Sequence, residues 1–456
     1  MASVLPALRN VRLDDKYEQD SGRVYLTGAQ AFVRLLILQH QRDRLAGLKT
    51  GGFVSGYRGS PLGALDQSLW KAQKFLERAN VVFQPGLNED LAATSIWGTQ
   101  QLTLHAGAKV DGVFAMWYGK GPGVDRCGDV FKHANMAGTA KHGGVLVLAG
   151  DDHAAKSSTL PHQSDHQFSA AMMPVLYPSS VQEILDLGLH GWAMSRYSGC
   201  WVGFKCVADT VESSASVYVD PERTRIVVPG DFPLPDSGVS IRWPDGFLDT
   251  EARMQDYKIY AALHYCRVNQ LNRIVIDSPQ PRLGIATSGK SYQDVRQALT
   301  DLGITDDDAA AMGLRVYKIA MPWPLEPEGV RHFAEGLTEI LVVEEKRQVV
   351  EYQLKEQLYN WRDDVRPRVV GKFDEKGEWV RPHGDWLLPA AGELTPAMIA
   401  RVIAKRIERL GLTPRRMEQL SARVDWINAK EAALARPKIA LVRQPYFCSR
   451  CPHHTS

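Results

Sequence analysis

The sequence has few cysteines, little net charge and no long hydrophobic run. Six cysteines in 456 residues are too few for a disulfide-stapled scaffold. The formal net charge is +2 and no basic tract is present, so nucleic acid is not a predicted partner. No apolar run approaches the ~20 residues of a membrane span, and the N-terminal residues lack the pattern of a secretory signal. We therefore expect a cytoplasmic protein that binds neither nucleic acid nor membrane.

Strand-like and helix-like segments alternate along most of the chain. Such alternation is typical of a parallel sheet covered by helices on both faces. A proline-rich region interrupts the pattern, which resumes at Arg282. We predict an α/β protein with a doubly wound parallel sheet. Its parts are a first domain over residues 1–217, a connector over 218–280, a second α/β domain over 281–407, a helical tail over 408–440 and the start of a further domain over 441–456.

Residues 52–99 combine the features of a ligand site. A strand-like run ends in a turn rich in glycine, and a second run is followed by a helix start at Asn88-Glu89-Asp90. In open α/β sheets, ligands bind at the carboxyl ends of the strands. A carboxylate in the first helical turn also stabilises the helix by ~0.3–1 kcal/mol, which is the simpler explanation of Glu89. If Glu89 is catalytic, we expect Leu87 and Ile96 to shield it from water.

Three further polar segments are candidates for a ligand site. Arg58, in the glycine-rich turn, could bind a substrate carboxylate or lie in solvent. The segment Gly119-Lys-Gly-Pro-Gly123 lacks the third glycine of a dinucleotide fingerprint, so we predict a ligand-facing loop at a strand end. A polar tract beginning at Asp151 contains His153 and His162. It could orient substrate through His153, bind a metal or simply be solvated.

Residues 284–291, GIATSGKS, match the phosphate-binding pattern GxxxxGK[ST] of ATPases. A true phosphate-binding loop follows a buried strand, whereas two prolines stand just before Gly284. We therefore predict that the strand is Leu283–Ala286 and that Ser291 caps the following helix. An ATPase that uses Lys290 remains a distant alternative.

Cys448-Ser-Arg-Cys451 is the one pair of cysteines at metal-ligand spacing. A four-cysteine zinc or iron–sulfur site needs two more ligands. The other four cysteines are isolated, and Cys200 and Cys206 lie in or beside an apolar strand, so we predict that they belong to the core. If the pair binds a cluster, the remaining ligands lie on residues absent from this chain.

Taken together, the order of these segments resembles the indolepyruvate (2-oxoacid) ferredoxin oxidoreductases, and most closely the N-terminal portion of the long fused bacterial form. The segments that carry the resemblance are Thr27–Ala31, Gly56–Pro61, Asn88–Glu89, Gly121–Gly123, Gly150–Asp152 with Ser157–Ser158, Gly284–Gly289 and Pro445–His453. Each segment is short, but seven of them in the order of the family form a specific pattern.

The resemblance implies a thiamine-diphosphate-binding-type first domain and a transketolase C-terminal-like second domain. Glu89 would be the catalytic carboxyl that activates the cofactor. Cys448 and Cys451 would be the first two thiolate ligands of a [4Fe–4S] cluster. The ligands of Mg²⁺ and of the diphosphate would lie in domains that this chain lacks. The residues implied to lie at the cofactor are Ser60, Pro61, Gly121 and Gly123.

The implied reaction is the oxidative decarboxylation of an aryl 2-oxoacid to an acyl-CoA. Ferredoxin and coenzyme A would be partners, together with a second copy of the chain or the missing domains. Arg58 departs from the small or apolar residue often found in relatives, so the resemblance assigns it no substrate. Two alternatives stay open, namely a non-oxidative thiamine diphosphate enzyme and a non-catalytic α/β subunit. We expect the chain to be inactive alone.

Overall fold

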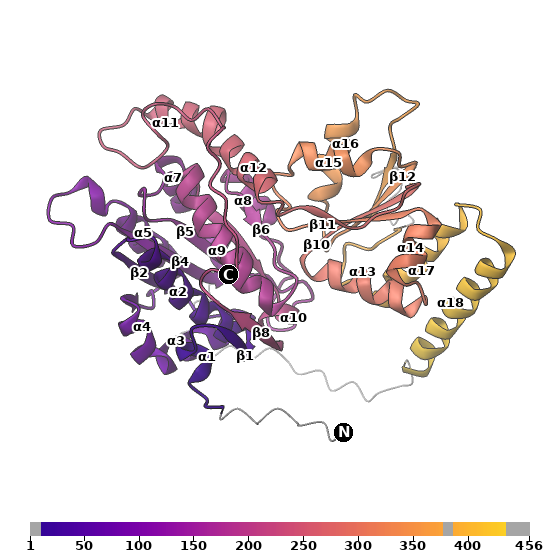
Figure 1. The fold of residues 1–456 in the computed structure, drawn as a ribbon, viewed down its shortest axis with the longest axis horizontal. Coiled ribbons are helices and arrows are strands. Elements are labelled where there is room, and N and C mark those ends of the chain that lie inside the picture. The colour runs from indigo at the N-terminus through magenta and orange to yellow at the C-terminus, as the bar shows by residue number, and fades with distance from the viewer. Residues whose placement is uncertain (1–10, 377–385, 435–456) are drawn as a thin grey trace, which may run out of the picture.

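The computed structural model describes residues 11–376 and 386–434, which form two α/β units lying side by side (Figure 1). The first unit runs from indigo to magenta in the figure, and the second from orange to yellow. Each unit is built around one sheet that carries parallel strands. The predicted α/β fold class is confirmed.

The first unit contains a six-stranded parallel sheet in the order β3-β2-β4-β5-β7-β6. Its strands are β2 (Thr50–Gly56), β3 (Val81–Phe83), β4 (Gly112–Lys120), β5 (Val145–Gly150), β6 (Val175–Leu176) and β7 (Val202–Cys206). In β4, Phe114 and Met116 join one hydrophobic cluster, whereas Ala115 and Trp117 join another. Because alternate side chains of a strand point to opposite faces, the sheet has a hydrophobic core on each side.

Helices cover both faces of this sheet. Residues of α2 (Gly28–Leu45) and α9 (Val181–Ser198) belong to one cluster, and residues of α5 (Glu89–Gln100), α7 (Gly128–Ala137) and α8 (Asp165–Ala170) to the other. Thr27 caps α2 as part of a capping box with Gln30, in which each side chain accepts the other residue's backbone N–H. The shorter elements are α1 (Asp15–Glu18), η1 (Leu62–Ala64), α3 (Leu65–Lys71), α4 (Gln73–Arg78), η2 (Leu102–Leu104), α6 (Gly121–Arg126) and α10 (Ala208–Val211).

The segments that flank the first unit pair with each other. β1 (Gly22–Thr27) runs antiparallel to β8 (Ser214–Val219) in a separate two-stranded sheet. Beyond β8, the chain forms α11 (Phe247–Arg253), the π-helical turn η3 (Met254–Lys258), α12 (Ile259–Val268) and β9 (Arg273–Ile276). β9 pairs with a strand of the second sheet, so the region predicted as a connector already contributes to the second unit.

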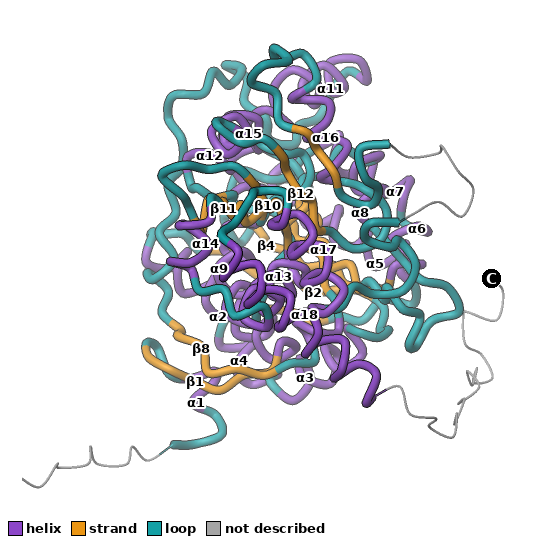
Figure 2. Tube along the Cα trace, turned by 90° about the vertical axis from the view of Figure 1, so that its right-hand side faces the viewer, coloured by secondary structure: helices purple, strands orange, loops and turns teal. Residues whose placement is uncertain are grey.

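The second unit contains a five-stranded sheet in the order β13-β12-β10-β11-β9. Strands β10 (Leu283–Ser288), β11 (Leu314–Ile319), β12 (Glu339–Val343) and β13 (Arg368–Val370) are parallel, and β9 is antiparallel to β11. The helices are α13 (Gly289–Asp301), α14 (Asp306–Met312), α15 (Pro327–Ala334), α16 (Val350–Leu358), α17 (Pro396–Glu408) and α18 (Pro414–Leu434). α18 lies at the outer edge of this unit, in the foreground of Figure 2.

Two local predictions need correction. Ser288, and not Ser291, occupies the N-cap position of α13, because β10 ends at Ser288 and the helix begins at the next residue, Gly289. The predicted loop at Gly119–Gly123 does not form either. β4 extends to Lys120 and α6 starts at Gly121.

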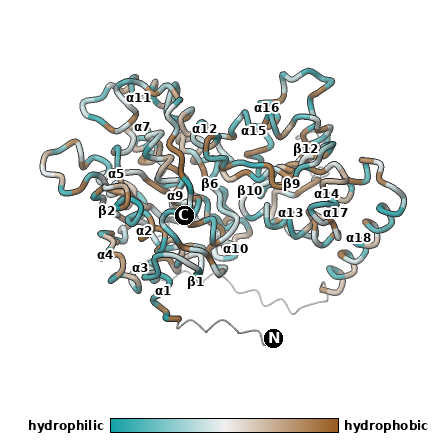
Figure 3. The backbone as a smooth tube through the Cα atoms, viewed as in Figure 1, coloured by the Kyte–Doolittle hydropathy of each residue, from teal (hydrophilic) through white to brown (hydrophobic). Residues whose placement is uncertain are grey.

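The cores of both units are apolar, and Figure 3 shows hydrophobic segments inside them and mixed colours along α18. Cys200 and Cys206 are fully buried in the first core, as predicted. Within residues 11–376 and 386–434, no helix is both long and apolar enough to cross a membrane. Cys448 and Cys451, with the predicted start of a further domain, lie outside the described residues.

Candidate functional site

Glu89 is the first residue of α5, which follows β3. Asn88 caps the helix by accepting the backbone N–H of Leu91 at 2.9 Å, so the Glu89 side chain does not serve as the cap. Glu89 is only 4% exposed, and among the described residues its Oε2 atom finds no hydrogen-bond donor. The Nη1 atom of Arg126 lies 3.7 Å from Oε2 in an ion pair. Because an unsatisfied buried polar group costs ~1–3 kcal/mol, a ligand that donates to this oxygen would be stabilised.

The surroundings of Glu89 differ in part from those predicted. Ile96 is buried, but Leu87 is 86% exposed, so its predicted shielding role is wrong. Residues of β4 and α6 instead shield the Glu89 side chain from water. The indole of Trp117 donates to the backbone oxygen of Glu89 at 3.1 Å, and Gly123 packs against the Glu89 side chain.

The two glycines predicted at the cofactor lie in the first turn of α6. A Cβ atom on Gly123 would stand 2.5 Å from Cγ of Glu89, and one on Gly121 would stand 2.3 Å from Cγ of His162. Both positions therefore need glycine, because the neighbouring side chains leave no room for a methyl group. His162 in turn places Nε2 at 3.0 Å from the Asp125 carboxylate. The glycines thus fix where Glu89 and His162 lie, and contact with a cofactor stays a prediction.

The turn after β2 lies beside the segment that leads to Glu89. The N–H of Gly86 donates to the carbonyl of Gly56 at 2.9 Å, which brings the two segments together. Ser60 and Pro61 are joined by a cis peptide bond, and Pro61 packs against Gly150 at the end of β5. β2 has β3 on one side and β4 on the other, so this edge is the switch point where open α/β sheets bind ligands. Arg58 is exposed at the same turn.

His153 is buried in the polar segment that follows β5. Its Nε2 atom lies 4.0 Å from the Asp151 carboxylate and has no hydrogen-bond partner among the described residues. Burial, followed by the charges of Lys205 and Lys346, holds the pKa of His153 well below its usual value, so the ring is neutral. A role in orienting substrate stays a prediction. The described residues contain no group of three or more His, Cys, Asp or Glu side chains placed to hold a metal ion.

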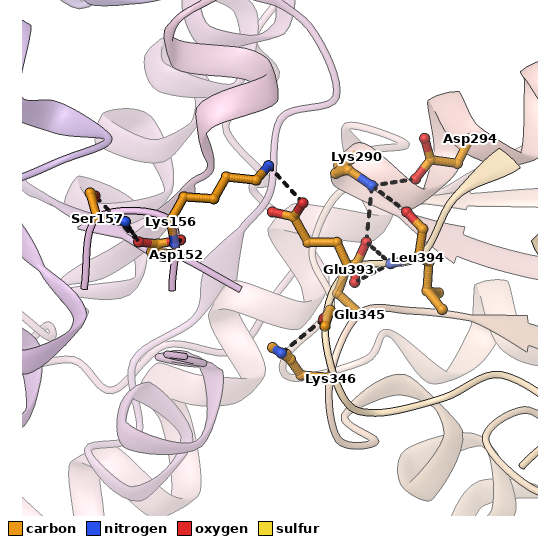
Figure 4. A network of polar contacts seen from close by, with 10 residues as sticks. Asp152, Lys156, Ser157, Lys290, Asp294, Glu345, Lys346, Glu393 and Leu394 are labelled. Carbon is orange, nitrogen blue, oxygen red and sulfur yellow. Dashed lines mark hydrogen bonds and ion pairs between the residues drawn. The ribbon is translucent and has the colours of Figure 1, made fainter. Parts of the chain in front are cut away.

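The same segment binds the second unit at two points. Lys156 places Nζ at 2.7 Å from the Glu393 carboxylate (Figure 4). Gln163 donates to the backbone oxygen of Arg347 at 2.8 Å and accepts its N–H at 3.0 Å. The second unit therefore holds the polar segment that closes one side of the candidate site.

Lys290, the lysine of the ATPase-like pattern, is hydrogen-bonded within the second unit (Figure 4). Its Nζ atom donates to Asp294 at 2.7 Å, to Glu345 at 3.1 Å and to the backbone oxygen of Leu394 at 3.0 Å. Burial opposes its charge, but Glu345 and Asp294 outweigh that effect and raise the pKa of Lys290. The lysine is thus engaged in contacts that join α13 to the rest of its unit.

A solved structure shares this arrangement of two α/β units. It is a 2-oxoglutarate:ferredoxin oxidoreductase from Magnetococcus marinus with 2-oxoglutarate, coenzyme A and succinyl-CoA bound. The TM-score is 0.57 at 15% sequence identity, covering 84% of this chain and 65% of that chain. The likeness is one of fold, so the protein shares the α/β fold of that oxidoreductase.

Sequence comparison identifies a matching family model and several relatives. Residues 272–437 match the family model of the indolepyruvate ferredoxin oxidoreductase middle domain. The chain is 26% identical over 453 residues to the indolepyruvate oxidoreductase subunit IorA of Methanothermobacter marburgensis, covering 97% of this chain and 61% of the relative. It is 26% identical over 454 residues to the IorA subunit of Pyrococcus abyssi, covering 96% and 59%. These comparisons indicate a protein of the indolepyruvate ferredoxin oxidoreductase type, as the sequence pattern predicted.

The chain spans about three fifths of the length of these curated relatives. Its assignment to the long fused bacterial form stays a prediction.

Proposed function

We propose that the chain is the cofactor-activating part of a thiamine-diphosphate-dependent oxidoreductase. The complete protein would oxidatively decarboxylate an aryl 2-oxoacid to an acyl-CoA, with ferredoxin as electron acceptor. The observation that carries the proposal is the buried Oε2 atom of Glu89, which finds no hydrogen-bond donor among the described residues. The aminopyrimidine ring of thiamine diphosphate offers such a donor. The names of the relatives support the substrate class and the acceptor.

When bound, thiamine diphosphate supplies the carbanion chemistry that decarboxylation needs. The task of this chain is to hold a proton at the Glu89 carboxyl, facing the ring. Trp117 of β4 donates to the Glu89 backbone and Gly123 of α6 packs against its side chain, so these two residues shield the carboxyl and fix its direction. Ser60 and Pro61 would lie against the ring at the end of β2.

The remaining cofactor ligands belong to other segments in this proposal. We assign the diphosphate and Mg²⁺ to parts of the complete protein outside the described residues; this chain covers 61% of the relative from Methanothermobacter marburgensis. Cys448 and Cys451 would contribute two thiolates to a [4Fe–4S] cluster completed there. Association with a second copy or with further subunits would bring these parts together.

The test is an assay of the full-length protein purified without air. With thiamine diphosphate, Mg²⁺ and coenzyme A, addition of an aryl 2-oxoacid should reduce ferredoxin and yield the acyl-CoA. Release of an aldehyde without reduction of ferredoxin would point to a non-oxidative thiamine enzyme. Failure to bind thiamine diphosphate and to consume any 2-oxoacid would point to a non-catalytic subunit.

Gly123→Ala should lower this activity at least tenfold, since the new methyl group must displace the Glu89 side chain. Misplacing a catalytic group by about 1 Å can cost 10²-fold in rate. Gly128→Ala is the matched control, because a Cβ at Gly128 meets nothing within 4 Å. Steady-state kinetics and thermal unfolding of both variants provide the comparison. Full activity in Gly123→Ala would show that α6 does not set the position of Glu89.

A further inference from the structure

A second concave site lies at the other end of α5 from Glu89. A cavity of about 560 Å³ opens between the end of α5 with η2, helix α7 and the segment leading into α11. This volume is within the range of small-molecule sites, roughly 300–1,000 Å³. α5 has 12 residues, so at 1.5 Å per residue its two ends are about 18 Å apart. The cavity is therefore distinct from the candidate thiamine site.

The walls of this cavity are rich in aromatic side chains. Trp97 of α5 stacks with His133 of α7, with ring centroids 6.4 Å apart and an angle of 25° between the planes. Trp243, in the segment before α11, and Phe247, the first residue of α11, also line the cavity, and they are 80% and 93% exposed. Burying such apolar area stabilises by roughly 25 cal/mol per Å². A flat aromatic ring would therefore be stabilised by entering the cavity.

The polar part of the lining has an excess of positive charge. Arg242 donates to the backbone oxygens of Gly238 and Ser240, which leaves its charge without a carboxylate. Lys132 also lines the cavity and makes no hydrogen bond or ion pair within the part of the chain that the structure describes. Asp245, the acidic residue of the lining, is already paired with Arg253. The lining therefore favours an anionic group beside the aromatic ring.

We propose that this cavity binds a small aromatic carboxylate. The ring lies against Trp97, Trp243 and Phe247, and the carboxylate lies toward Lys132 and Arg242. A small molecule fits better than a protein partner, because the aromatic side chains surround a hollow of ligand size and do not form a flat patch. The inference does not rest on the proposed catalytic function, since none of these side chains belongs to the Glu89 site.

The test is calorimetric titration of the full-length protein with indole-3-acetate, which has no 2-oxo group. We expect saturable binding with a Kd of about 0.1 mM or tighter, which corresponds to roughly 5.5 kcal/mol. Trp243→Ala and Lys132→Ala should each weaken binding at least tenfold. Trp70→Ala and Lys71→Ala are matched controls on α3, away from the cavity lining, and should leave the Kd unchanged.

Two further probes separate the contributions of ring and charge. Indole has no carboxylate and cyclohexylacetate has no aromatic ring, so each should bind at least tenfold more weakly than indole-3-acetate. The absence of saturable binding, or Trp243→Ala and Lys132→Ala variants that bind indole-3-acetate as tightly as the unsubstituted protein, would overturn the proposal. So would sedimentation showing that Phe247→Ala breaks up an oligomer, because the aromatic residues would then form a protein contact.

Discussion

Glu89→Gln in the full-length protein should reduce 2-oxoacid-dependent reduction of ferredoxin by about 10³-fold. Glutamine keeps the size and hydrogen-bonding capacity of the side chain, but it cannot hold and return the proton. Loss of a general acid–base group typically costs 10²–10⁴-fold in rate. The effect should fall on kcat, measured with saturating thiamine diphosphate, while thermal unfolding changes little.

Asp90→Asn is the matched control for this substitution. Asp90 follows Glu89 in the first turn of α5 and also lies near Arg126, at 3.8 Å, but its side chain is far more exposed. It should keep its activity within about threefold, because exposed ion pairs contribute only ~0–1 kcal/mol. Equal losses in both variants would indicate a general effect of charge at the helix start. Unchanged turnover in Glu89→Gln would remove the catalytic assignment.

Much of the fold could be predicted because its signals are local in the sequence. Strands buried on both faces of a parallel sheet are continuous apolar runs, as in Val145–Gly150. The cap at Thr27 depends on residues three positions apart. β9 was assigned to the connector because it is a four-residue edge strand, antiparallel to its neighbour, outside the βα repeat.

The candidate site could be predicted only in part, for a physical reason. The place of Glu89 at a helix start after a strand is a local property, and the sequence pattern indicates it. Its real neighbours, Trp117 and Gly123, are 28 and 34 positions away, so their contact depends on how β4 and α6 pack against α5. Leu87 failed as a shield because proximity in sequence does not determine which way a side chain points at a turn.

The contacts between segments that are far apart in the sequence were the least predictable part. The pattern around Lys290 suggests a nucleotide site, and only the packing of β12 and the segment before α17 brings Glu345 and Leu394 to this lysine. Likewise, the pairs Lys156–Glu393 and Gln163–Arg347 join residues about two hundred positions apart. The resemblance implies only that the second domain is transketolase C-terminal-like. The second unit contacts the segment after β5, and so it helps to shape the candidate site of the first unit.

A buried ionic cluster in the first unit leads to the second large effect. Lys205 of β7 places Nζ at 2.5 Å from the Asp165 carboxylate and 3.5 Å from that of Asp151. All three side chains are buried. Burial opposes the charge of Lys205, but Asp165 and Asp151 outweigh it and raise the lysine's pKa above its usual value. Lys205 is therefore the cation that allows these carboxylates to remain buried.

Lys205→Met should lower the free energy of unfolding by ~3–5 kcal/mol at neutral pH, because it leaves buried carboxylates without their cation. Lys156→Met is the control. Its ion pair with Glu393 is at the surface, with the lysine side chain 60% exposed, and its loss should cost less than ~1 kcal/mol. Urea unfolding followed by circular dichroism measures both variants. A loss below about 1 kcal/mol in Lys205→Met would show that the cluster tolerates the missing charge.

The pH dependence of this loss follows from Asp151. Burial already raises the pKa of Asp151, and Lys205 is the strongest influence that lowers it. Without Lys205, the pKa of the folded state rises further above that of the unfolded chain. The folded protein then binds a proton more tightly than the unfolded one, so stability is kept at low pH and lost as the pH rises. The destabilisation by Lys205→Met should therefore be larger at pH 8 than at pH 5. Equal losses at the two pH values would show that the effect comes from packing differences between lysine and methionine. The charge of Asp151 would then play no part in it.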